Sequence, residues 1–169
     1  FEEVGEEDPT WGGKPITFPR IQGADVCGEI VEVGEGINSS RIGQRVITDG
    51  WLRDSIDPFN KNNTGYFGSE CDGGFADYTV IPSGNAISIN SNLTNAELAT
   101  FSCSYSTAEG MLNKANVTKI DTVLVPGASG GVGGALIQLS KRRKARVIAL
   151  ASEKKHEDVI SLGADKILP

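Results

Sequence analysis

Cysteine and histidine are scarce in this sequence, which has three cysteines and one histidine among its 169 residues. The cysteines, Cys27, Cys71 and Cys103, are odd in number and show no C-x-x-C spacing. A disulfide framework needs cysteines in pairs, and a zinc ribbon needs closely spaced pairs. The sequence therefore indicates neither, and we expect free thiols in a reducing compartment.

The chain also lacks a basic excess and long apolar runs. Its 16 lysines and arginines are outnumbered by 22 acidic residues, which gives a formal net charge of −6. This balance disfavours nucleic acid and anionic membrane surfaces as partners. No stretch reaches the roughly 18 consecutive apolar residues of a membrane span, and the acidic residues 1–8 are unlike a signal peptide. We therefore expect a cytoplasmic protein that binds neither nucleic acid nor membrane.

Glycine, in contrast, is abundant, with 21 residues gathered in clusters. The length allows one ordinary domain or two incomplete ones, at about 100 to 200 residues per domain. An apolar share of 38% and a charged share of 22% are typical of a chain that folds.

Short runs of alternating apolar and polar residues mark the first half of the chain. Alternation with a period of two is typical of half-buried strands. Glycines punctuate these runs, and Gly73 and Gly74 open one of them. The pattern predicts a mostly β, barrel-like region with strands at residues 28–34, 45–47, 75–81 and 86–89.

From Thr94 onward the pattern changes to alternating helices and strands. Thr94 and Glu97 form a capping-box pattern, and residues 98–114 predict either one helix broken near Cys103 or two short helices. Strand-like and helical runs then alternate as β-α-β-α-β. This order predicts the opening of a doubly wound parallel sheet, with elements at residues 121–125, 132–144, 146–150, 154–162 and 166–168.

A glycine-rich stretch, G-A-S-G-G-V-G at residues 127–133, joins the first of these strands to the first helix. It departs from the usual G-x-G-x-x-G pattern, with Ala128 at the first position, and Pro126 is expected just beyond the last hydrogen bond of the strand. Backbone N–H groups at a helix N-terminus attract negative charge, and glycines let a diphosphate approach them. With Gly133 allowing close packing of the helix, we predict a dinucleotide diphosphate site at Ser129, Gly130, Gly131 and Val132.

The end of the second parallel strand, at Ala151 or Ser152, carries no acidic residue. A carboxylate there would hold the ribose hydroxyls of NAD and would repel a 2′-phosphate by roughly 4 kcal/mol at about 4 Å and an effective dielectric constant of about 20. We therefore predict NADP (NADPH) as the cofactor, with a hydrogen bond from Ser152 and a positive charge from Lys154 or Lys155. Of these, Ser152 and Lys155 are the predicted site residues. Glu153 leaves NAD open as an alternative, if the turn is one residue longer.

Two features near this site are not assigned to the cofactor. The basic run at residues 141–144 falls at the end of a predicted helix, where cations interact favourably with the helix dipole. His156 is expected to be a solvated helix residue.

Five short motifs accompany the glycine loop in a fixed order: G-A-D-V-C-G at 23–28, V-E-V-G-E-G at 31–36, I-G-Q-R-V at 42–46, D-G-G-F-A-D-Y at 72–78 and S-C-S-Y-S-T at 102–107. Together they resemble the medium-chain dehydrogenase/reductase superfamily. The resemblance implies an α/β protein in which a GroES-like β-barrel portion, residues 1–92, precedes the first half of a Rossmann doubly wound parallel sheet, residues 93–169. It also implies that both domains are incomplete, so we expect part of a longer protein that is inactive by itself.

The zinc ligands of the alcohol dehydrogenases in this superfamily are largely missing. Ala24 stands where their catalytic histidine would be, and only Cys71 is present where four cysteines hold a structural zinc. Cys103 matches a third catalytic ligand and Asp25 has a carboxylate that can coordinate, which leaves a zinc-type alcohol dehydrogenase relative as an alternative. The closer resemblance is to the zinc-independent branch of quinone oxidoreductases and enone reductases. We therefore expect no metal site.

The resemblance implies an NADPH-dependent oxidoreductase that transfers hydride to a quinone, enone or carbonyl substrate. Thr107 matches a position that approaches the nicotinamide, and Tyr105 one that faces the substrate or donates a proton. Both are predicted catalytic residues, with helix packing as the alternative. A dinucleotide-binding protein without turnover is a further alternative. The expected partner is a small-molecule substrate that the sequence does not identify, and the resemblance allows a homodimer of the intact protein.

Overall fold

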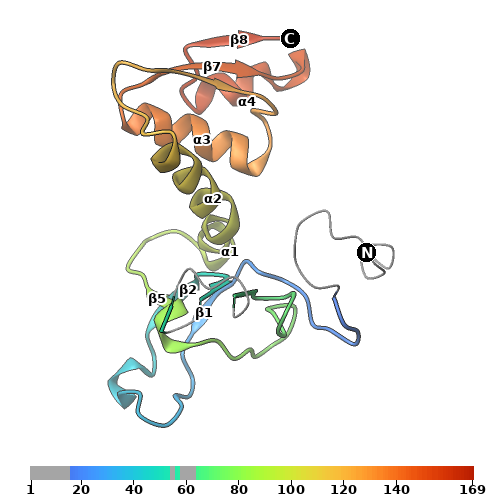
Figure 1. The fold of residues 1–169 in the computed structure, drawn as a ribbon, viewed down its shortest axis with the longest axis vertical. Coiled ribbons are helices and arrows are strands. Elements are labelled where there is room, and N and C mark those ends of the chain that lie inside the picture. Colours follow the sequence, from blue (N-terminus) through green and yellow to red (C-terminus); the bar gives the residue numbers. More distant parts are fainter. Residues whose placement is uncertain (1–15, 54–55, 58–63) are drawn as a thin grey trace. The chain divides into compact units, whose positions relative to one another are not determined.

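The computed structural model describes residues 16–53, 56–57 and 64–169. The chain divides into two compact units, Phe1–Ser102 and Cys103–Pro169, coloured blue to yellow and yellow to red in Figure 1. Along the chain, the division falls within helix α2 (Phe101–Lys114). The domain boundary expected after residue 92 stays a prediction.

The first unit contains a three-stranded antiparallel sheet of short strands. Its order is β1-β2-β5, and it consists of β1 (Cys27–Glu29), β2 (Arg45–Thr48) and β5 (Ala86–Ser88). A two-stranded sheet joins β3 (Trp51–Leu52) to β4 (Gly65–Tyr66), and short 3₁₀ helices, η2 (Ser39–Arg41) and η4 (Ser83–Asn85), lie in the connections. The strands predicted at 45–47 and 86–89 are confirmed, and the one predicted at 28–34 ends at Glu29.

The strand predicted at residues 75–81 does not form. The backbone pairs with residues 21–23 only up to Phe75, whose N–H donates to the carbonyl of Gln22 at 2.9 Å. Beyond it, Tyr78 and Val80 are 76% and 90% exposed. The prediction was wrong because alternation gives a chain two faces, whereas a strand also needs a partner along its length.

Helix α1 (Asn95–Ala99) begins with the predicted capping box. The N–H of Glu97 donates to Oγ1 of Thr94 at 3.2 Å, and the N–H of Thr94 donates to Oε2 of Glu97 at 2.8 Å. The N–H of Thr94 first, and then its hydroxyl, which donates to the same carboxylate oxygen at 2.8 Å, lower the pKa of Glu97. The helical region is interrupted at Thr100, three residues before the predicted break, and α2 then runs uninterrupted to Lys114.

The second unit is an α/β layer with a parallel sheet. Strands β6 (Thr122–Val125), β7 (Arg146–Leu150) and β8 (Lys166–Leu168) lie in the order β6-β7-β8, with Val123 beside Val147 and Ala149 beside Ile167. Helix α3 (Gly131–Arg142) connects β6 to β7, and η5 (Glu153–Lys155) with α4 (His156–Ser161) connects β7 to β8. The predicted β-α-β-α-β order is confirmed, and Pro126 follows the last paired residue of β6 as expected.

The core of this unit lies between the sheet and its helices. Its fully buried members are small or aliphatic and come from the strands, the helices and the turn after β6: Val125, Ala128, Ile137, Val147, Ala149 and Val159. Burial alternates along β7, where Arg146 is exposed and the next residue is fully buried. This core fixes the ends of β6 and β7, from which the candidate site is built.

Candidate functional site

The loop between β6 and α3 is a tight turn tied to the neighbouring strand. Gly127 has φ +60°, a conformation that residues with a side chain rarely adopt. The N–H of Ala128 donates to the carbonyl of Leu150 at 3.1 Å, and the N–H of Gly130 donates to that of Gly127 at 3.0 Å. The turn therefore places the start of α3 directly beyond the carboxyl end of β6.

The first turn of α3 is uncapped by side chains. Gly130 is the N-cap, no side chain accepts from the turn, and the turn contains no acidic residue. The first N–H groups of a helix lack acceptors within the helix, and the helix dipole makes this end positive. The basic residues Lys141 and Arg142 lie in the last turn, as predicted. The sequence thus leaves the N-terminus of α3 suited to an anionic group.

The glycines of this turn differ in what a side chain at each position would meet. A Cβ on Gly133 would lie 2.3 Å from the carbonyl oxygen of Gly127, so this residue permits close packing of helix on loop. A Cβ on Gly131 would lie 2.6 Å from Oγ of Ser104 on α2, a neighbour that sequence reasoning missed. A Cβ on Gly130 would meet only the Gly127 carbonyl, at 3.4 Å. Ser129 is exposed and Val132 half-buried, so the four predicted diphosphate residues are brought together on one turn.

The turn after β7 carries the other predicted cofactor residues. Ser152 is exposed and precedes η5, and its carbonyl accepts from the N–H of Lys155 at 2.8 Å. Nζ of Lys155 pairs with Oδ2 of Asp158 at 3.1 Å. His156 is half-buried, and its Nε2 lies 3.0 Å from the carbonyl oxygen of Ala151. The expectation of a solvated histidine was therefore wrong, because this ring holds the end of β7.

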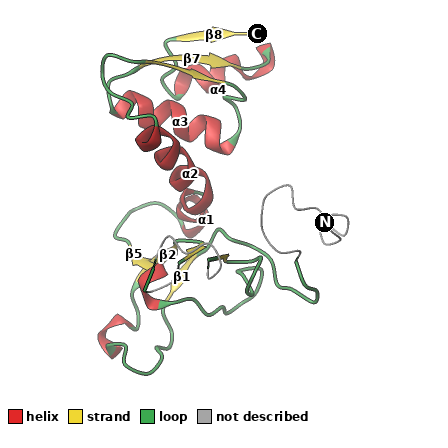
Figure 2. Ribbon diagram, in the orientation of Figure 1, coloured by secondary structure: helices red, strands yellow, loops and turns green. Residues whose placement is uncertain are grey.

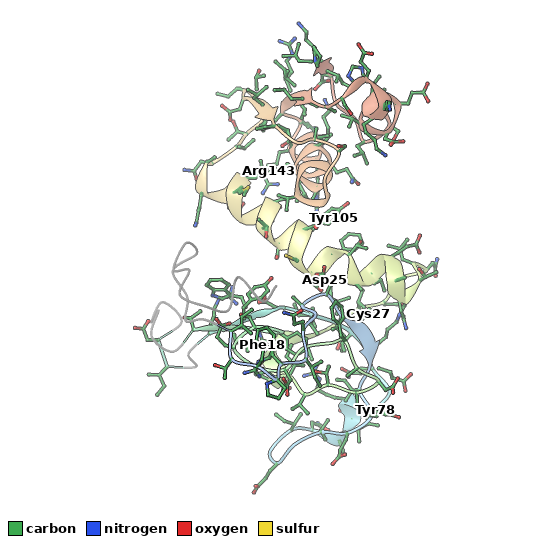
Figure 3. The ribbon with its side chains drawn as sticks, turned by 90° about the vertical axis from the view of Figure 1, so that its right-hand side faces the viewer. Phe18, Asp25, Cys27, Tyr78, Tyr105 and Arg143 are labelled. Atoms are coloured by element: carbon green, nitrogen blue, oxygen red, sulfur yellow. The ribbon has the colours of Figure 1, made fainter. Side chains whose placement is uncertain are left out.

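The two predicted catalytic residues lie on different faces of α2, because side chains two positions apart on a helix do not face each other. Nε2 of Gln138 on α3 donates to the hydroxyl oxygen of half-buried Tyr105 at 2.8 Å. Thr107 is exposed. The structure therefore places Tyr105 against α3 and does not bring Thr107 to the same place. Figure 3 labels Tyr105 on α2.

Further along, α2 is joined to α3 by an ion pair. Arg143 donates to both carboxylate oxygens of Glu109, at 2.6 and 3.1 Å, and to the side-chain oxygen of Asn113 at 2.9 Å. This hydrogen bonding is the main cause that lowers the pKa of Glu109. Part of the basic run predicted as helix C-terminal cations thus also fastens α3 to α2.

The segment around Ala24, which stands where the zinc-binding histidine of the alcohol dehydrogenases would be, has other contacts in the first unit. The carbonyl of Ala24 accepts from Oγ1 of Thr48 at 3.2 Å, and Sγ of Cys27 donates to Oδ1 of Asn95 at 3.5 Å. Within the described ranges, no three histidine, cysteine or acidic side chains form a group that could hold a metal. A catalytic zinc takes three protein ligands, and the absence of zinc from this protein stays a prediction.

Comparison with known proteins identifies the family. Residues 5–91 match the model of the alcohol dehydrogenase GroES-like domain. An acryloyl-coenzyme A reductase from Metallosphaera sedula is 29% identical, over 90% of this chain and 48% of its own length. A chloroplast envelope quinone oxidoreductase homolog from Arabidopsis thaliana is 31% identical, over 91% of this chain and 44% of its own.

Solved structures agree with this relationship. A candidate alcohol dehydrogenase from Sinorhizobium meliloti 1021 has a TM-score of 0.85 at 44% identity, covering 96% of this chain and 46% of its own. A short chain alcohol dehydrogenase from Escherichia coli CFT073, complexed with NADH, has a TM-score of 0.82 at 28% identity, covering 89% of this chain and 47% of its own.

The chain therefore belongs to the medium-chain dehydrogenase/reductase superfamily, and its first half is a GroES-like domain of the alcohol dehydrogenase type. It spans about half the length of the relatives it matches. The resemblance is confirmed at the level of the superfamily. Separately, none of the helices in the described part of the chain is long and apolar enough to cross a membrane.

Proposed function

We propose that this chain is part of an NADPH-dependent oxidoreductase of the zinc-independent, quinone oxidoreductase-like branch, and that residues 103–169 are the first half of its Rossmann domain. The single observation that carries the proposal is the start of α3, where a tight glycine turn leaves uncapped N–H groups beyond a parallel strand. Such a terminus binds the diphosphate of a dinucleotide. Relatives named as oxidoreductases, one of them in complex with NADH, support a nicotinamide cofactor.

Two turns of the chain would bind different parts of the cofactor. The backbone at Ser129, Gly130, Gly131 and Val132 would hold the diphosphate. Ser152 and Lys155 would hold a 2′-phosphate, because the end of β7 has no acidic residue that would repel it. When bound, the cofactor would supply the hydride for a quinone, enone or carbonyl substrate.

The predicted catalytic residues have unequal structural support. Tyr105 is held by Gln138 on the same helix that would bind the diphosphate, and this contact would orient its phenol relative to the cofactor. We propose Tyr105 as the substrate-side or proton-donating group. Thr107 would contribute to placing the nicotinamide from the exposed face of α2. Zinc plays no part in this proposal, because Ala24 has no side chain that can coordinate a metal.

The test is a fluorescence titration of the chain with NADPH and NADH, comparing Gly130→Asp with Gly130→Ala. The φ of −81° at Gly130 suits any residue, and a Cβ there makes an ordinary contact. Aspartate is a strong N-cap, so the Gly130→Asp variant should keep or gain stability while its carboxylate occupies the N–H groups and repels the diphosphate. We expect nucleotide binding to be lost in Gly130→Asp and retained in Gly130→Ala.

Thermal unfolding of both variants separates loss of binding from loss of fold. Equal affinity in Gly130→Asp and the unaltered chain, or no saturable binding of either nucleotide to the unaltered chain, would overturn the proposal. A preference for NADH would overturn its NADPH component alone.

A further inference from the structure

Lys155, the lysine that the proposed function assigns to a 2′-phosphate, already has a carboxylate partner. Its Nζ lies 3.1 Å from Oδ2 of Asp158, three residues further along the chain. The two side chains are 55% and 67% exposed, so the pair forms in contact with solvent. Such a pair is weak, and an incoming anion can displace its carboxylate.

The backbone around this pair is held in place from two sides. The N–H of Lys155 donates to the carbonyl of Ser152 at 2.8 Å. Nε2 of His156 lies 3.0 Å from the carbonyl oxygen of Ala151, the residue that follows β7. The backbone that carries Lys155 and Asp158 is therefore held in place at the start of the turn. Only side chains need to move when an anion competes with Asp158 for the ammonium group of Lys155.

A phosphate monoester carries a charge of about −1.5 to −2 at neutral pH, like a phosphorylated side chain. It would compete with Asp158 for the same ammonium group. Asp158 would also stay close to the phosphate after displacement and repel it. NADH has ribose hydroxyls at this position instead of a phosphate, and so it would experience neither effect.

We propose that Asp158 is a specificity-determining residue that weakens the binding of NADPH, and not of NADH, by pairing with Lys155. The inference rests on the proposed function, because it takes the 2′-phosphate to bind at Lys155. In this arrangement Lys155 favours NADPH and Asp158 limits the preference.

The test measures the dissociation constants of NADPH and NADH for Asp158→Asn and for a matched control. Glu157→Gln removes the same charge one residue earlier in the first turn of α4, from a side chain with no ion pair among the described residues. Exposed pairs contribute about 0.2 to 1 kcal/mol, so Asp158→Asn should tighten NADPH binding by roughly 1.4- to 5-fold and leave NADH unchanged. Glu157→Gln should change the affinity for NADPH or NADH by less than Asp158→Asn changes the affinity for NADPH.

A second background tests whether the effect acts through Lys155. In Lys155→Met, NADPH binding should weaken, and adding Asp158→Asn should no longer tighten it. An equal gain from Glu157→Gln, a gain that persists in Lys155→Met, or an equal shift for NADH would overturn the role of Asp158 while leaving the proposed function standing. If the unaltered chain binds neither nucleotide, the proposed function itself fails. Circular dichroism melting of each variant verifies that all are folded.

Discussion

The two units of the chain are stabilised by different kinds of interaction. In the second unit, helices pack on a parallel sheet over residues that are completely buried, among them Ile137, Val147 and Val159. The first unit has longer connections and shorter strands, which Figure 2 shows as loops in green around small yellow arrows. Among its described residues the buried apolar side chains are few, with Phe67 at 1% exposure the largest.

Arginine side chains compensate for this small core. Arg45 donates to Oδ1 of Asn95 at 2.7 Å and to the carbonyls of Ser91 and Leu93 at 2.9 and 2.6 Å, which fixes the connection from β5 to α1 against β2. Arg41 likewise donates to the carbonyl of Ser83 at 2.8 Å. The comparison shows that a buried apolar core stabilises the second unit, whereas hydrogen bonds between residues that are distant in sequence stabilise the first.

The largest expected effect comes from the core of the second unit. Ile137→Ala removes a fully buried side chain from α3, and large-to-small substitutions of this kind cost about 2 to 5 kcal/mol of unfolding free energy. Ile160→Ala on α4 is the matched control, because this side chain is 59% exposed and should cost much less. Chemical denaturation of both variants measures the difference. Equal losses would show that the second unit does not depend on this core.

A smaller effect is expected from the polar contacts of the first unit. Arg45→Met keeps the apolar stem but removes three donated hydrogen bonds, and we expect a loss of about 1 to 3 kcal/mol, since the acceptors are only partly shielded from water. Arg53→Met is the control. Its exposed pair with Asp49, at 2.9 Å, should contribute about 0 to 1 kcal/mol. If Arg53→Met is as damaging as Arg45→Met by the same measurement, the contrast between the units is wrong.

This contrast also explains what the sequence could predict. In the second unit β7 was predicted at its exact bounds and Pro126 at its exact place, because local apolar periodicity and turn residues determine both. In the first unit the strand predicted at 75–81 fails, because its pairing depends on which distant backbone lies beside it. No local signal marked the three acceptors of Arg45 either.

Some features of the candidate site are likewise local in sequence, and others depend on packing. The glycine turn and the absence of an acid after β7 are local features, so both could be found from sequence. The proximity of Ser104 to Gly131 and the hydrogen bond from Gln138 to Tyr105 depend on how α2 packs on α3. The pairing of Lys155 with Asp158 depends on the turn that leads into α4. Of these three features, only the pairing of Lys155 has a visible sequence signal, because Asp158 is an acidic residue three positions after a lysine at the start of a predicted helix.

The smallest expected effect is an acid-dependent loss of stability in the second unit. Nζ of Lys141 lies 2.7 and 2.8 Å from the two carboxylate oxygens of Asp165, and the N–H of Val147 donates to Oδ2 at 2.6 Å. The lysine first, and then the backbone N–H, hold the pKa of Asp165 below its ordinary value of 3.8. Because the folded pKa is the lower one, this contribution is complete above the unfolded pKa and is lost as the pH falls through the folded pKa.

Urea unfolding at a series of pH values from neutral to strongly acidic measures this loss. The free energy of unfolding should fall less steeply below about pH 4 in Asp165→Asn than in the unaltered chain. Lys141→Met should give an intermediate slope, because the N–H of Val147 still favours the ionised carboxyl. The difference will be small, since the lysine and aspartate side chains are 35% and 36% exposed and water screens their attraction. An unchanged slope in Asp165→Asn would mean that this carboxylate does not couple the C-terminus of α3 to β7.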